Sequence, residues 1–335
     1  MKNIRTIDLH QFNLEKGKQQ TLISLSYQIF GLPIGTAPII VVNHSLTGNS
    51  NVCGRNGWWK DIIGENKTIN TEAYTIIAFN IPGNGYNENP DDLIPNYRDF
   101  TIRDIANLFW EGLFKLKVNS LFALIGGGLG GAIAWEMAVL QPKRIENLIP
   151  IATDWKATNR IIATVLIQDQ LLNNSEDPLV DARYYAGLYF KNPEFVNQLF
   201  NRKNLDSDSI ETIETCVSQN NQYQISGYRL MNFIQKYNDL CRNRADFNSV
   251  MKSIKATIHI IGIDTNSMYS IDENQNTFVR LQKIGSKVYY NEMNSKFGND
   301  AYEKETKKIA SYLQPIFNSK HISIRSKFNY YYMNA

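Results

Sequence analysis

Residues 121–140, LFALIGGGLGGAIAWEMAVL, decide the fold. The uninterrupted apolar run at 121–125 is typical of a parallel strand that is buried on both faces. The glycines of 126–131 predict a tight turn, because glycine adopts backbone angles that other residues avoid. The apolar and small residues that follow predict a helix. A strand, a Gly-x-x-x-Gly turn and a helix in this order are typical of a nucleophile elbow.

The turn lacks the side chain that such an elbow presents. In the G-x-S-x-G pattern the middle position is Gly128, between Gly126 and Gly130, and glycine cannot attack an acyl carbonyl. A dinucleotide phosphate loop, G-x-G-x-x-G, is a second interpretation, but no acidic residue follows about twenty positions later. A glycine-rich packing turn is the third. Since the nucleophile of an elbow has a strained backbone, we expect a positive φ at Gly128.

Strands and helices alternate on both sides of this turn. Apolar or alternating runs predict further strands at 20–30, 38–43, 74–80, 148–152, 256–262 and 286–290. Helical spacing predicts a helix over 101–117, capped by Thr101, and a closing helix over 300–317. This order predicts an α/β protein with a mostly parallel central sheet flanked by helices. If the turn is a nucleophile elbow, this sheet is that of the α/β-hydrolase fold.

The segment 155–250 differs from the rest, because helical patterns predominate there and no buried strand run appears. It is predicted to be a helical lid insertion between two parts of one core, 1–154 and 251–317. The tail, 318–335, carries basic residues and four aromatics. It is expected to be a frayed terminus, with a partner-docking arm as the alternative.

Composition narrows the classes of function. The net charge of +3, with scattered basic residues, argues against a nucleic-acid partner. Cys53, Cys216 and Cys241 form neither a disulfide framework nor a CxxC metal site, so no metal is expected. No signal peptide and no apolar run of membrane-spanning length is evident, so we expect a cytoplasmic protein without membrane contact.

Several uncommon sequence motifs, which occur in the same order, resemble those of homoserine O-acetyltransferases. The matches are 44–48 (HSLTG) to the family's HALTG loop, 57–59 to its GWW, 101–104 to its TIRD and 149–152 to its IPIA. They cover residues 25–155 and return at 256–305, with Ala182-Arg183 and Tyr228 as the clearest matches in the insertion. The resemblance implies acetyl transfer from acetyl-CoA to homoserine, for methionine biosynthesis, by a Ser-Asp-His triad. No other cofactor is implied.

This chain departs from that triad at all three positions. The family's elbow reads GGSMGG, and its serine falls on Gly128. The family's GIDSD and YGHDAF runs match 262–266 and 297–302, which places Asn266 at the aspartate and Asn299 at the histidine. An amide neither accepts a proton near neutral pH nor stabilises an imidazolium. Asp264, two residues before Asn266, could replace only one of the three.

The resemblance also implies positions for substrate binding. Its oxyanion-hole donors, which are backbone N–H groups, fall at Leu46 and Leu129. The substrate-pocket positions are Tyr228 and Asp300, with Gln222 where the family has an arginine, and His44 and Cys53 close by. A Cys53–His44 catalytic pair is one alternative, and a partly buried, unreactive Cys53 is the other. His259 is expected to be a buried structural residue.

The sequence therefore predicts a catalytically silent member of this family, a pseudoenzyme with a binding or regulatory role. The former active site would hold a small-molecule ligand, and lid helices would form a homodimer or a heteromer. Two alternatives stay open. One is an enzyme of different mechanism in the same pocket, such as a lyase or a non-covalent acyltransferase. The other is an active acyltransferase with acetyl-CoA as its donor.

Overall fold

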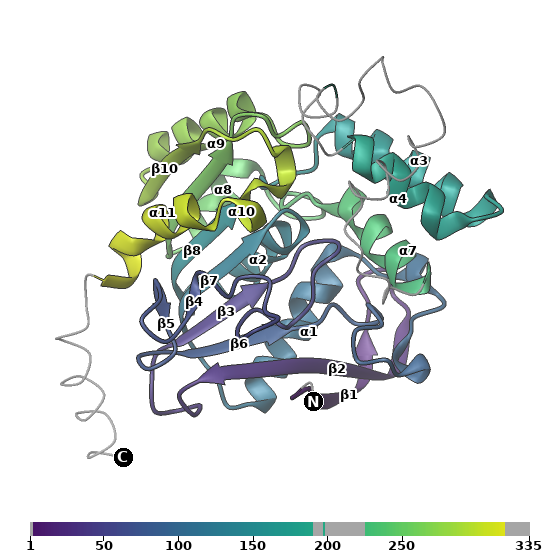
Figure 1. The fold of residues 1–335 in the computed structure, drawn as a ribbon, viewed down its shortest axis with the longest axis horizontal. Coiled ribbons are helices and arrows are strands. Elements are labelled where there is room, and N and C mark those ends of the chain that lie inside the picture. Colours follow the sequence, from purple (N-terminus) through teal and green to yellow (C-terminus); the bar gives the residue numbers. More distant parts are fainter. Residues whose placement is uncertain (1–2, 190–196, 198–224, 319–335) are drawn as a thin grey trace.

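The computed structural model describes residues 3–189, 197 and 225–318, and it is built around one eight-stranded sheet (Figure 1). The strand order is β1-β2-β6-β3-β7-β8-β9-β10. The strands are β1 (Arg5–Asn13), β2 (Gln19–Gly31), β3 (Ile39–Asn43), β6 (Thr75–Phe79), β7 (Leu121–Gly127), β8 (Ile145–Ile151), β9 (Thr257–Ile263) and β10 (Val288–Met293). The β1–β2 and β2–β6 pairs are antiparallel, and the neighbours from β6 to β10 pair in parallel. The predicted mostly parallel sheet is confirmed. The short β4 (Ile63–Gly64) and β5 (Ile69–Asn70) pair separately.

The central strands are apolar throughout because both of their faces are buried. Along β3, Ile40 and Val42 belong to one hydrophobic cluster and Val41 to the other. Successive side chains of a strand point to opposite faces, so each cluster fills the space between the sheet and one layer of helices.

The described helices flank the faces of the sheet or, within residues 155–234, lie beyond the ends of its strands (Figure 1). They are α1 (Ile102–Lys115), α2 (Leu129–Leu140), α3 (Asn159–Asn174), α4 (Pro178–Tyr189), α7 (Ile225–Ile234), α8 (Phe247–Ser253), α9 (Ile271–Lys283), α10 (Ala301–Lys304) and α11 (Thr306–Asn318). Single 3₁₀ turns lie at Pro90–Asp92, Tyr97–Asp99, Gln235–Tyr237 and Gly298–Asp300. Thr101 caps α1 as predicted, in a reciprocal capping box with Asp104.

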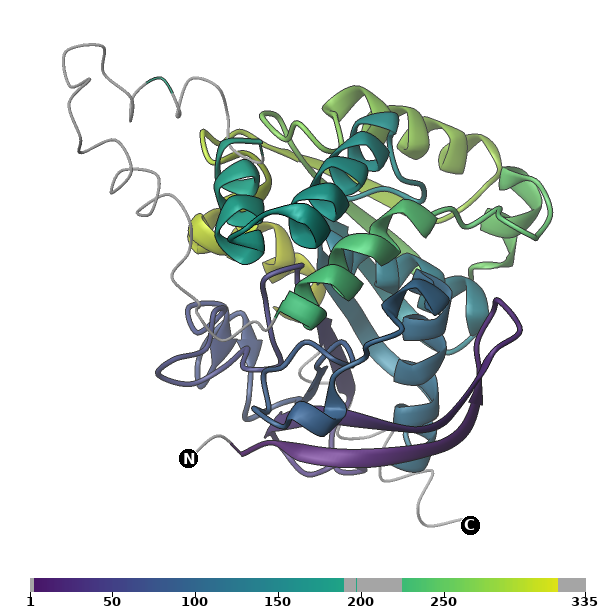
Figure 2. The same ribbon diagram turned by 90° about the vertical axis from the view of Figure 1, so that its right-hand side faces the viewer.

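Three elements differ from the prediction. β1 was not predicted, and it pairs with β2 in the long curved hairpin seen in Figure 2. The polar helix α9 was also missed, although Ser270 and Glu273 form a capping box at its start. The helix predicted over 300–317 is present as two segments instead of one. It is broken at Glu305, where the backbone turns to φ −102° and ψ 53° between α10 and α11.

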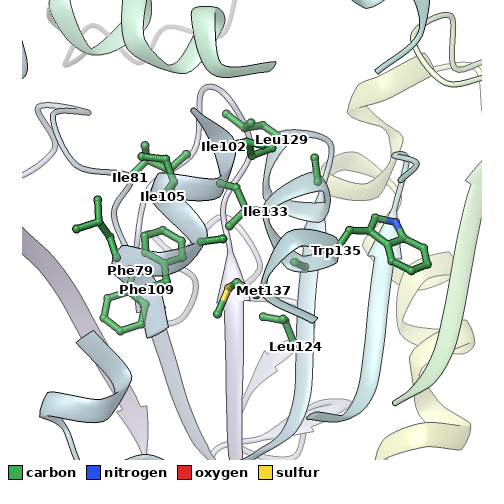
Figure 3. Packing of buried hydrophobic residues seen from close by; sticks show 14 of the residues in the cluster. Phe79, Ile81, Ile102, Ile105, Phe109, Leu124, Leu129, Ile133, Trp135 and Met137 are labelled. Atoms are coloured by element: carbon green, nitrogen blue, oxygen red, sulfur yellow. The ribbon is translucent and has the colours of Figure 1, made fainter. Parts of the chain in front are cut away.

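The α1 and α2 helices pack on one face of the sheet. Figure 3 shows Phe79, Phe109, Ile133 and Met137 between them and the strands. A buried ionic network links the two helices to each other and to neighbouring segments. Glu136 of α2, 1% exposed, pairs with Arg103 of α1 at 2.6 Å and also with Arg244. Arg103 pairs in turn with Glu15, which Arg242 also contacts.

The helix α7 covers the ends of the strands from which the site is built. A Cβ on its Gly227 would lie 2.5 Å from the carbonyl oxygen of Gly83, in the loop after β6. The predicted insertion, 155–250, contains α3, α4 and α7, and its boundary falls inside α8. Cys216, Gln222 and the tail from 319 lie outside the described residues. Among the helices that the structure describes, none is long and apolar enough to cross a membrane.

Candidate functional site

The turn between β7 and α2 has the geometry of a nucleophile elbow. Gly128 has φ +52° and ψ −119°, so the predicted positive φ is confirmed. A Cβ on Gly126 would lie 2.2 Å from the carbonyl oxygen of Gly130, and one on Gly130 only 2.4 Å from that of Asn43. Glycine is therefore required at both flanks, because the strand, the helix start and the loop after β3 meet there.

Gly128 itself could carry a Cβ that makes only ordinary van der Waals contacts. A Cβ built on it would have no neighbour closer than 3.8 Å, the distance to Nδ2 of Asn299, with Oδ1 of Asn299 and the Tyr302 hydroxyl both at 3.9 Å. The fold thus brings together the two positions predicted for the nucleophile and the base. Neither residue supplies the chemistry, since glycine has no side chain and an amide is not a base.

Asn266 caps the turn that follows β9. It is buried, and its Oδ1 accepts hydrogen bonds from the backbone N–H groups of Met268 at 2.9 Å and Tyr269 at 3.4 Å. Asp264 is the alternative acid that the sequence offers. Its Oδ1 accepts from the N–H of Ser295 at 2.9 Å, so it anchors the loop after β10. Within the described residues, no hydrogen bond joins either side chain to Asn299.

His44 joins two loops rather than serving as a base. Its Nε2 accepts from the N–H of Ile81 at 2.9 Å, and Nδ1 lies 2.7 Å from the carbonyl oxygen of Ser45. The first contact requires an unprotonated Nε2, so Nδ1 carries the hydrogen and donates it to Ser45. Burial lowers the pKa of His44 to about 4. The ring is neutral near pH 7, and the backbone engages both nitrogens.

Cys53 does not pair with His44. Its sulfur lies 3.4 Å from the carbonyl oxygen of Ile63, and burial raises the pKa of the thiol. The thiolate is the reactive form, so this environment makes Cys53 less reactive than an exposed cysteine. His259 is held elsewhere, with Nε2 at 3.3 Å from Oδ1 of Asn147 and its ring stacked on Tyr289.

The two backbone positions implied for the oxyanion hole lie on facing segments. Leu129 is the first residue of α2, where helical N–H groups have no partner within the helix. Leu46 follows β3 in the loop whose carbonyls at Asn43 and His44 approach Gly130. Across the part of the chain that the structure describes, neither N–H donates to a protein acceptor. Their role as donors stays a prediction.

Tyr228 and Asp300 come from different elements. Tyr228, on α7, is buried, and its hydroxyl accepts from Nε2 of Gln168 at 3.3 Å. Burial raises the pKa of Tyr228 to about 12, so its phenol is neutral. Asp300 lies next to Asn299 and is partly exposed, with Lys304 at 4.0 Å. Their assignment to a substrate pocket also stays a prediction.

The sequence interpretation missed a polar group beside the elbow. Oγ of Ser45, which is buried, donates to Oε1 of Glu303 on α10 at 2.9 Å. The ring of Tyr302 packs on Gly127, where a Cβ would lie 2.3 Å from it. The sequence did contain a sign of this group in the motifs that match the family. Ser45 occupies the alanine position of HALTG, and Tyr302 occupies the phenylalanine position of YGHDAF.

No metal site accompanies these residues. Within the described ranges, no group of three or more His, Cys, Asp or Glu side chains is placed to hold a metal ion.

Comparisons with known proteins agree with this architecture. A family model for the alpha/beta hydrolase fold matches residues 38–207, about half of the chain. Homoserine O-acetyltransferase from Moorella thermoacetica is 26% identical, over 90% of this chain and 92% of that protein. The enzyme of the same name from Symbiobacterium thermophilum is 28% identical, over 86% and 87%.

Solved structures show the same fold at low identity. Homoserine O-acetyltransferase from Bacillus anthracis superposes with a TM-score of 0.85 at 17% identity, covering 95% of this chain and 98% of that one. The enzyme from Staphylococcus aureus gives 0.79 at 22% identity, covering 98% and 99%. Esterase E22 gives 0.83 at 18% identity, covering 94% and 99%. The chain therefore belongs to the alpha/beta hydrolase fold family, and within it the chain is homoserine O-acetyltransferase-like.

Proposed function

We propose that this protein does not perform the acetyl transfer for which its relatives are named, and that it uses the site at the elbow to bind a small molecule. One observation carries the proposal. Gly128 keeps the strained backbone of the elbow but offers no nucleophile, and the side chain nearest to its missing Cβ is the amide of Asn299, at 3.8 Å.

The size of the expected loss follows from the chemistry of such triads. Removing the whole triad of a serine hydrolase lowers the rate constant by about 10⁶-fold. That factor corresponds to roughly 8 kcal/mol of activation free energy. Three neighbouring groups could be considered as replacements, and each is engaged with backbone atoms instead. They are Cys53, His44 and Asp264.

A binding role is supported by what the site keeps. The backbone N–H groups of Leu46 and Leu129 do not depend on the lost side chains, and they suit the oxygen of a carbonyl or carboxylate group. Because Gly128 has no side chain, a ligand can occupy the volume that a nucleophile would otherwise fill. Tyr228 and Asp300 would supply further polar contacts, because they match positions that bind the substrate in the family that the chain resembles.

The test is a direct assay of the pure full-length chain with acetyl-CoA and homoserine. We expect no release of free CoA and no O-acetylhomoserine by mass spectrometry, while the Moorella thermoacetica relative, assayed in parallel, gives both. Titration calorimetry with each compound then measures binding. Turnover within about 10³-fold of the active relative, far above the level left without a triad, would refute the proposal.

We also propose that the chain is cytoplasmic and acts as a homodimer, or as a heteromer with an active relative, through its lid helices. This part rests on the resemblance alone. Light scattering on the purified chain gives its oligomeric state, and a pull-down from the native organism identifies a heteromeric partner. A monomer with no stoichiometric partner would contradict it.

A further inference from the structure

A carboxylate beside the elbow has no place in the lost triad. Glu303 accepts a hydrogen bond from the Ser45 hydroxyl at 2.9 Å, and the Tyr302 hydroxyl also hydrogen-bonds to it. Ser45 and Glu303 are 258 positions apart in the sequence. Their contact joins the loop after β3 to α10, and Tyr302 extends the group to within 3.9 Å of the missing Gly128 side chain.

Glu303 is held mainly by hydroxyl groups. Among the ion pairs of the described residues, none includes Glu303, and Lys304 lies 4.0 Å from Asp300. Burial and the negative charge of Asp300 raise the pKa of Glu303, while the two hydroxyl donors and the positive charge of Lys304 oppose that rise. A carboxylate with a raised pKa and a hydroxyl in contact is the usual arrangement of a general base.

We propose that Ser45 and Glu303 form a nucleophile–base pair, separate from the lost triad, that reacts with small activated esters. Oγ of Ser45 attacks the carbonyl carbon, and its proton passes to Glu303. The new C–O bond forms, the bond from the carbonyl carbon to the leaving oxygen breaks, and the leaving group takes the proton from Glu303. The product is an ester on Ser45.

The loop geometry supports this role for Ser45. The distance of 2.9 Å lies within the range of about 2.6–3.2 Å for a nucleophile and its base. The carbonyl of Ser45 accepts from Nδ1 of His44 and from the N–H of Gly48 at 3.1 Å, so the loop is held in place. The next residue, Leu46, has an N–H without a protein acceptor among the described residues, and it would bind the developing oxyanion.

The test uses an alkyl fluorophosphonate, which phosphonylates activated serines. Oγ attacks phosphorus, the P–F bond breaks, fluoride leaves, and the proton goes to Glu303. We expect mass spectrometry of the digested full-length chain to find the label on the peptide that contains Ser45, and Ser45→Ala to abolish it. Glu303→Gln, which keeps the size of the side chain but not the base, should slow labelling by about 10²-fold. Ser50→Ala is the matched control, because Ser50 lies in the same loop but donates to Gln28.

The pH profile gives a measure that needs no variant. Labelling should fall as the pH drops through the raised pKa of Glu303, because the protonated carboxyl cannot accept the Ser45 proton. A mere structural tie between the loop and α10 would give no label at Ser45 while an active esterase is labelled in parallel, and that result overturns the proposal. Equal labelling rates in the wild type and Glu303→Gln also overturn it.

This inference does not depend on the proposed binding role, and the two fail separately. Formation of O-acetylhomoserine by the wild type would refute the proposed function whatever happens at Ser45. Absence of a Ser45 adduct would refute the nucleophile–base pair and leave the proposed function standing.

Discussion

The elbow turn makes a quantitative prediction about alanine substitutions. In Gly128→Ala the new Cβ meets nothing closer than 3.8 Å, so the cost is backbone strain alone. A positive φ costs a residue with a Cβ about 1–2 kcal/mol. In Gly126→Ala the Cβ would lie 2.2 Å from the carbonyl oxygen of Gly130, which no side-chain rotation relieves. Forcing the strand and helix apart should cost about 3 kcal/mol or more.

Urea unfolding followed by circular dichroism measures both free energies of unfolding. We expect Gly128→Ala to be expressed and folded, with its midpoint lowered modestly, and Gly126→Ala to be severely destabilised or insoluble. Gly17→Ala is the matched control, since it has φ +82° with no atom within 4 Å of the added Cβ. It should resemble Gly128→Ala. Equal losses at positions 126 and 128 would show that position 128 is packed, and the elbow interpretation would be refuted.

Two further predictions concern buried charge. Glu136→Gln should lower the free energy of unfolding by about 3 kcal/mol, because Arg244 loses its carboxylate partner and Arg103 keeps only its pair with Glu15. A urea titration that shows a change below about 1 kcal/mol would contradict this. Burial raises the pKa of Asp154 to about 7, so its ionisation opposes folding increasingly from about pH 4 to pH 7. Asp154→Asn can still accept a hydrogen bond from Thr277 but carries no ionisable group. Its advantage over the wild type in free energy of unfolding should therefore grow by about 2–3 kcal/mol from pH 5 to pH 8. A difference that does not change with pH would disprove this.

The parts of the fold that could be predicted are those in which local sequence and burial agree. The strands buried on both faces, such as β3 and β7, appear as apolar runs because each residue must enter one of two cores. The helix α9 was missed since its buried face includes Asn274 and Thr277, which bond to the backbone and to Asp154 rather than forming an apolar stripe.

The candidate site was predictable only in part, for a related reason. The backbone of the elbow is local, so the glycine pattern at 126–131 was enough to predict the positive φ at Gly128. The contact of Ser45 with Glu303 is not local, and no spacing rule connects residues so far apart in the chain. The same limit applies to His44, because its pairing with the N–H of Ile81 depends on the approach of two loops.

The residues at the three positions that the resemblance assigns to a triad are consistent with one another in physical terms. Glycine at 128 removes the strain that a serine would bear at φ +52°. Asn266 keeps an oxygen that accepts from Met268 and Tyr269, but it removes a negative charge from a site only 4% exposed. That charge is useful only beside an imidazolium, and Asn299 cannot become one. Once the base is absent, a buried aspartate costs stability without a catalytic return, because a buried carboxylate without a cation is poorly solvated. The residues at 128 and 266 therefore each avoid a cost that only a complete triad justifies, and the backbone contacts of the scaffold do not depend on triad side chains.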